Sequence, residues 1–78
     1  MQLEIITAES QLYSGEVTSV KLPGMDGEFE ILNNHAPVIS TLDKGIIRVI
    51  DKNNKTKNFE VNGGVIEMQN NKIIVLAD

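Results

Sequence analysis

The stretch Val20–Gly45, VKLPGMDGEFEILNNHAPVISTLDKG, decides the fold. Two glycine-containing turns lie close together near its start. Pro23-Gly24 has the residue types of a type II turn, and Asp26-Gly27 has those of a hairpin tip. Charged and apolar residues then alternate from Glu28 to Ile31, which predicts a strand with its apolar side chains facing a core. The stretch therefore predicts a rigid β scaffold that presents polar corners.

Composition limits the classes of protein that this chain can belong to. Its 78 residues make one small domain, and ten Ile and seven Val against three aromatic residues indicate a core of β-branched side chains. A net charge of −4 argues against nucleic acid or an anionic membrane surface as the direct partner. The chain has no cysteine, so it has no disulfide framework and no thiolate metal site. We expect a soluble domain without a signal peptide, because an acidic residue stands where an apolar leader segment would begin.

Turn residues recur every eight to twelve residues or so, and no stretch shows helical spacing of apolar residues, so we expect an all-β sandwich or barrel. Cutting the chain at every turn signal gives about ten short strands. In that reading Gln11–Gly15 is a link, Asp43–Gly45 turns the chain and Asn62–Gly64 ends a strand. A slip in the apolar phase predicts a bulge near Thr18-Ser19. Hairpin tips are expected at Lys52–Lys55 and Gln69–Asn71, and the last strand, Lys72–Ala77, is apolar on both faces and so is expected to be central.

Candidate chemistry is sparse. Glu28 and Glu30 lie on one strand face, about 7 Å apart, a separation found in some glycosidases. Nothing apolar nearby would raise the pKa of one carboxyl relative to the other, so we interpret them as solvated or facing a partner. His35 is the only histidine, and it has neither a nucleophile nor further metal ligands in recognisable order, so a turn or contact role fits it better. Gly63-Gly64 is too short for a phosphate-binding loop. We therefore expect no catalytic residues, no cofactor and no metal.

Short motifs spread over the whole chain resemble the epsilon subunit family of bacterial F-type ATP synthases. Each motif is brief, but their order and spacing together are specific. They are Gly27-Glu28-x-x-Ile31, Asn34-His35-Ala36-Pro37, Leu42-x-x-Gly45-x-Ile47-x-Val49, Ala8-Glu9 with Ser14-Gly15, Gly63-Gly64-Val65-x-Glu67 and Val75-Leu76-Ala77-Asp78.

The resemblance implies a flattened sandwich of two mostly antiparallel sheets and a non-catalytic place in the rotating central stalk. Such a subunit docks on the gamma subunit and on the c-ring and couples proton- or sodium-driven rotation to ATP synthesis on other subunits. It would lie at the cytoplasmic face of the bacterial inner membrane as a peripheral protein, and it would be a monomer when isolated. Matched to the family, the c-ring side comprises Asp26, Gly27, Glu28 and His35, which share one end of the sandwich. The gamma side comprises Val38, Ser40 and Leu42.

The chain departs from the family pattern at its end. Most members continue into two C-terminal helices that inhibit hydrolysis and in some cases bind ATP, whereas this sequence stops at Asp78. We therefore expect a domain that neither inhibits through such helices nor binds nucleotide. The alternative is a biotinyl- or lipoyl-carrier domain, which needs a modifiable lysine at a hairpin tip. The tips here carry Asn53-Asn54 and Asn70-Asn71, and an intact mass of native protein would separate the two readings.

Overall fold

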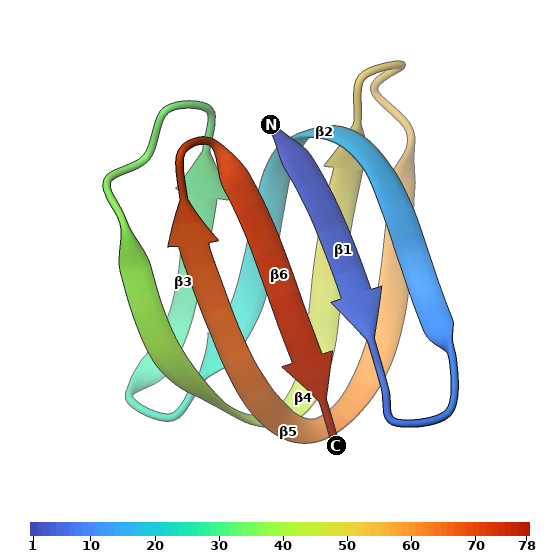
Figure 1. Ribbon diagram of the computed structural model, residues 1–78, viewed down its shortest axis with the longest axis vertical. Coiled ribbons are helices and arrows are strands. Elements are labelled where there is room, and N and C mark those ends of the chain that lie inside the picture. The colour runs from blue at the N-terminus through green and yellow to red at the C-terminus, as the bar shows by residue number, and fades with distance from the viewer.

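The computed structural model describes residues 1–78, which form six strands and no helix (Figure 1). Three strands are short and three are long enough to bend from one layer to the other. The strands are β1 (Gln2–Ile6), β2 (Gln11–Gly24), β3 (Gly27–Leu32), β4 (Val38–Asp51), β5 (Thr56–Gln69) and β6 (Lys72–Ala77).

The strands follow the order β1-β6-β5-β4-β2-β3, and β1 also pairs with β2, so the sheet closes on itself. Only β1 and β6 run parallel; every other pair is antiparallel. One layer contains β1, β6 and the half of β5 from Gly64 to Gln69, and the other contains β3 with the later halves of β2 and β4 (Figure 1). The domain is flattened, with extents of 27 × 24 × 18 Å. The expected all-β sandwich is confirmed.

Alternate side chains of all six strands meet between the two layers. They form a single apolar core, dominated by the β-branched residues that the composition indicated. Its members are Met1, Leu3, Ile5, Val17, Val20, Leu22, Ile31, Leu42, Ile47, Val49, Val61, Ile66, Met68, Ile73, Val75 and Ala77.

The prediction of about ten short strands is wrong, because three of the expected breaks lie inside long strands. Gln11–Gly15 is the first part of β2, and Asp43–Gly45 lies within β4. Asn62–Gly64 bends β5 without ending it: Gly63 and Gly64 have φ of 117° and 145°. The β4–β5 register continues across this bend, from Leu42 opposite Gly64 to Lys44 opposite Asn62.

Pro23-Gly24 is also part of a strand and not a turn. Proline has no backbone N–H for a ladder, and Pro23 lies where the register between β2 and β4 shifts, between Lys21 and Gly24. The chain reverses just after it, at Met25-Asp26, where Gly24 pairs with Gly27 and Gly27 has φ of 122°. The hairpin tip expected around Asp26-Gly27 is therefore confirmed.

The remaining local predictions agree with the structure. The β2–β4 register shifts between Val17 and Ser19, as the apolar phase slip indicated. Asn54, Asn70 and Asn71 take left-handed backbone conformations at the two expected hairpin tips. The last strand, β6, lies between β1 and β5.

Candidate docking surfaces

The first candidate group lies on the turn between β2 and β3. Asp26, Gly27 and Glu28 are all exposed there. Glu28 has one cationic neighbour, Lys21, whose Nζ lies 3.8 Å from Glu28 Oε1. Exposed pairs of this kind contribute little to stability, which leaves the carboxylates of Asp26 and Glu28 available to a partner.

His35 does not share that end of the domain. It lies in the loop between β3 and β4, and β3 separates this loop from the β2–β3 turn (Figure 1). Six residues of strand span about 17–20 Å. The expectation that Asp26, Gly27, Glu28 and His35 form one end of the domain is therefore wrong. The length of β3 separates the turn that carries Asp26 from the loop that carries His35.

The His35 loop is fastened by hydrogen bonds. The His35 backbone N–H donates to the Leu32 carbonyl at 3.2 Å, and the imidazole Nδ1 lies 2.7 Å from the Ala36 carbonyl oxygen. The Asn34 N–H donates to Asn71 Oδ1 at 2.9 Å, across 37 residues of chain. We refer to residues 33–37 as the His35 corner.

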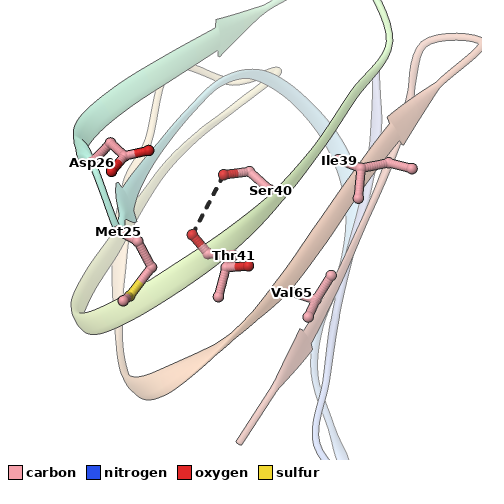
Figure 2. A pocket seen from close by; sticks show the side chains of 6 residues that line it. All are labelled: Met25, Asp26, Ile39, Ser40, Thr41 and Val65. Carbon is pink, nitrogen blue, oxygen red and sulfur yellow. Dashed lines mark hydrogen bonds between the residues drawn. The ribbon is translucent and has the colours of Figure 1, made fainter.

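The three residues expected on the gamma side, Val38, Ser40 and Leu42, lie on the inward-facing side of β4. Leu42 is 2% exposed and belongs to the core, against which Val38 also packs. Ser40 is half-buried, and its hydroxyl donates to the Thr41 carbonyl at 3.4 Å (Figure 2). Because side chains alternate along a strand, it is Ile39 and Thr41 that face outward here.

Ile39 belongs to an exposed apolar surface that the sequence reading missed. Ile39 is 77%, Leu76 56% and Val65 45% exposed, and Ile74 is half-buried beside them. The strand registers place them together: Val65 is opposite both Thr41 and Leu76, and Glu67 is opposite both Ile39 and Ile74. We call these four apolar residues on β4, β5 and β6 the apolar outer face. Its one sequence signal was the run IIVLA, which is apolar on both faces.

A shallow hollow extends the apolar outer face toward the β2–β3 turn. It has a volume of about 500 Å³, and Figure 2 shows Met25 and Asp26 on one side and Ile39 and Val65 on the other. Met25 is 58% exposed, and its backbone N–H donates to the Thr41 carbonyl at 3.1 Å, which joins the turn to β4. The hollow is open and has a mixed lining, as expected of a contact surface and not of a small-molecule site.

Glu30, the second carboxylate considered above, forms hydrogen bonds within the domain. Its Oε2 accepts hydrogen bonds from the Ser19 hydroxyl and from Arg48 Nη2, each at 2.6 Å, and Arg48 Nη2 also donates to Ser19 at 2.7 Å. Glu28 and Glu30 therefore do not form a pair of free carboxylates that could act as acid and base, because Glu30 is already bonded to Ser19 and Arg48. The structure also contains no group of three or more His, Asp or Glu side chains arranged to hold a metal ion.

Comparison with known families gives one match that covers the chain from end to end. The family described as ATP synthase, delta/epsilon chain, beta-sandwich domain matches residues 1–78. The chain belongs to this family. The resemblance drawn from the Asn34–Pro37 and Leu42–Val49 motifs is thus confirmed.

Curated members of the family named ATP synthase epsilon chain agree. The chain is 44% identical over 78 residues to the protein of Campylobacter curvus (strain 525.92), of which it covers 60%. It is 44% identical to that of Leptospira borgpetersenii serovar Hardjo-bovis (strain JB197), of which it covers 61%. It is 39% identical over 77 residues to that of Chlorobium limicola, covering 88% of that protein. The chain therefore spans about three fifths of the first two relatives and most of the third.

Two solved structures share the fold of this epsilon-family domain. A chain in the Euglena gracilis mitochondrial ATP synthase (OSCP/F1/c-ring) superposes with a TM-score of 0.87 at 16% identity, covering 96% of this chain and 48% of that one. A chain in the Tetrahymena thermophila mitochondrial ATP synthase central stalk and c-ring gives 0.79 at 14% identity, covering 99% and 62%. These likenesses support the same β-sandwich. The structure contains no helix long and apolar enough to cross a bilayer.

Lowering the pH should reduce the free energy of unfolding of this epsilon-family domain, because Glu30 becomes protonated. The Ser19 hydroxyl, followed by Arg48, holds the pKa of Glu30 below its usual range. A carboxylate with a lowered pKa in the folded state adds stability above its unfolded pKa, and that contribution disappears as the pH falls through the folded value. We expect the free energy of unfolding, measured with urea, to decline below about pH 4 and Glu30→Gln to remove part of the decline.

Asp51 provides the comparison for this measurement. The Lys55 backbone N–H, and then that of Asn53, lower the pKa of Asp51, so Asp51→Asn should remove a separate part of the same decline. An unchanged pH dependence in Glu30→Gln would show that the Ser19–Glu30–Arg48 cluster contributes nothing to acid sensitivity.

Proposed function

We propose that this chain is a non-catalytic central-stalk component of an F-type ATP synthase, which docks on the gamma subunit and the c-ring. In this role it couples ion-driven rotation to ATP synthesis on other subunits and lies peripherally at the membrane. Membership of the epsilon family supports the role, as do likenesses to chains in two ATP synthase assemblies that contain a c-ring.

The apolar outer face is the observation that carries this proposal. Exposed apolar side chains gathered on one surface mark a site of protein–protein contact. Acidic side chains accompany them, with Glu67 between Ile39 and Ile74 and Asp26 at the edge of the hollow. The partner surface should therefore be apolar, with basic groups at its rim, and we assign this face to the gamma subunit.

The gamma contact then uses β4 through residues other than those first expected. Ile39 and Thr41 reach outward, while Leu42 is buried and Val38 packs against the core. We assign the c-ring contact to Asp26, Gly27 and Glu28, whose exposed acidic turn suits basic or amide groups on polar loops. His35 lies at the other end of β3 and is not part of that contact.

Ile39→Glu should weaken binding to the rotor. A carboxylate buried in an apolar contact without a partner costs several kcal/mol, and a tenfold loss of affinity corresponds to only about 1.4 kcal/mol. We expect Ile39→Glu to bind an assembled gamma–c-ring complex at least about tenfold more weakly than the unmodified chain. The dissociation constant can be measured by titrating labelled chain onto the complex.

Ile46→Glu is the matched control. Ile46 lies on the same strand and is 51% exposed, but it is outside the apolar outer face. Its substitution should change the affinity less than about twofold, since it removes no proposed contact. Urea unfolding of both variants checks that the fold is intact. Unchanged binding of Ile39→Glu, or equal losses in both variants, would contradict the assigned face.

A further inference from the structure

The hollow beside the β2–β3 turn has walls that backbone hydrogen bonds hold in place. Met25 and Asp26 form one wall, and Ile39 and Val65 form the other (Figure 2). The Met25 N–H donates to the Thr41 carbonyl at 3.1 Å, which joins the turn to β4. Thr41 in turn lies opposite Val65 in the β4–β5 ladder. The shape of the hollow therefore exists before a partner arrives, and binding does not have to order it.

Asp26 gives this hollow a negative charge that no group of the domain balances. The ion pairs between side chains involve Glu4, Glu28 and Glu30, and Asp26 takes part in none of them. No Lys, Arg or His side chain lines the hollow. A concave surface lined by charge of one sign focuses its electric field, so the complement of this hollow is a cation.

The apolar part of the walls suits the aliphatic stem of a long side chain. Met25 is 58% exposed on one side, and Ile39 is 77% and Val65 45% exposed on the other. Lysine and arginine lay their methylene groups along apolar surface and keep the charge at the tip. A purely apolar side chain in the hollow would cover the Asp26 carboxylate without offering it a partner, which is unfavourable. A basic side chain satisfies both parts of the lining.

A second copy of this chain fits the apolar outer face poorly. Asp26 borders the hollow, Glu67 lies between Ile39 and Ile74, and the chain carries a net charge of −4. In a symmetric dimer a surface meets the same surface of its partner. Those carboxylates would then approach one another across the interface. The occupant is therefore a different chain that carries basic groups.

We propose that the hollow receives one lysine or arginine side chain of the partner that docks on the apolar outer face, and that Asp26 selects its positive charge. This inference rests on the proposed function, which assigns that face to the gamma subunit, and it adds the type of residue that the gamma subunit presents there. Asp26 lies where the two assigned contacts meet. Its carboxylate serves the gamma side, while Gly27 and Glu28 remain for the c-ring.

The test titrates the labelled 78-residue chain onto a gamma-containing assembly that lacks the c-ring, so that the c-ring contact contributes nothing. Asp26→Asn keeps the shape of the side chain and removes its charge. We expect its dissociation constant to rise about tenfold, because a charge pair across the interface is lost. The affinity should also depend less on salt concentration. Asp26→Lys should bind more weakly still, since it brings two positive charges together.

Glu28→Gln is the matched control. Glu28 lies on the same turn and loses the same charge, but it is outside the hollow, and its Oε1 lies 3.8 Å from Lys21 Nζ. Its substitution should change the dissociation constant less than about twofold. Equal losses in Asp26→Asn and Glu28→Gln would mean that only the net charge of the turn matters, and would overturn the proposal. Urea unfolding of each variant checks that the fold is intact.

Ile39→Glu separates this inference from the proposed function. If Ile39→Glu weakens binding and Asp26→Asn does not, the assigned face is correct and the hollow receives no basic side chain. If neither variant weakens binding, the assignment of the face itself is wrong. Sedimentation of the chain alone should show a monomer. A dimer that Ile39→Glu abolishes would assign the face to a second copy and overturn the proposal.

Discussion

Gly64→Ala is expected to remove a large part of the free energy of unfolding of the domain. Gly64 has φ of 145°, a conformation that residues with a side chain rarely adopt. A Cβ atom there would overlap the Leu76 carbonyl oxygen and lie 3.0 Å from the Ala77 Cα. Both are backbone atoms of β6, and Gly64 pairs directly with Ala77, so β6 could not give way without losing its ladder. We expect a loss of more than about 3 kcal/mol, a large part of the stability of a domain of this size.

Gly27→Ala is the matched control for that result. Gly27 also has positive φ, 122°, but a Cβ added there meets nothing within 4 Å. Only the backbone strain remains, which costs about 1–3 kcal/mol. Circular dichroism with urea titration compares the two variants. Equal stability of Gly64→Ala and Gly27→Ala would contradict the view that close packing against β6 makes Gly64 indispensable.

Ile66→Ala should produce the second large loss, through a cavity in the core. Ile66 is fully buried on β5 and lies between Ser40 of β4 and Val75 of β6. Paired strands on both sides restrict collapse around the vacated space, so we expect a cost of about 2–5 kcal/mol. The urea midpoint should fall while the slope of the transition stays constant.

Ile39→Ala tests whether burial is the cause of that loss. Ile39 lies on the neighbouring strand and is 77% exposed, so its truncation should change the free energy of unfolding by no more than about 0.5 kcal/mol. A comparable loss in Ile39→Ala would mean that the apolar outer face is covered in the isolated chain.

Local patterns in the sequence correctly predicted the fold class, the hairpin tips and the bulge before Ser19. They failed where pairing overrides local preference. Gly63-Gly64 has the residues of a strand break, yet β5 continues through it because β4 pairs with it on one side and β6 on the other. Turn propensity is a property of a few neighbouring residues. These pairings instead join Gly64 to Leu42, 22 positions earlier, and to Ala77, 13 positions later.

The candidate site was predicted less well, for two physical reasons. Alternation along Val38–Leu42 distinguishes two faces of β4, but with apolar residues on both it does not show which face is inside. Ile39 has the character of a core residue and is instead 77% exposed. The tie of Asn71 to the His35 corner has no sequence signal, because it depends on chain segments that meet only in the folded domain.

The position of β6 has a consequence for the way the domain is made. This strand is the sixth along the chain and yet lies between the first strand and the fifth. During synthesis on a ribosome, β1 and β5 each keep one unpaired edge until residues 72–77 have emerged and inserted between them. Such contacts between distant residues form slowly, and open strand edges attract other chains. A nascent chain interrupted before β6 would therefore be a poorly folded species prone to aggregation.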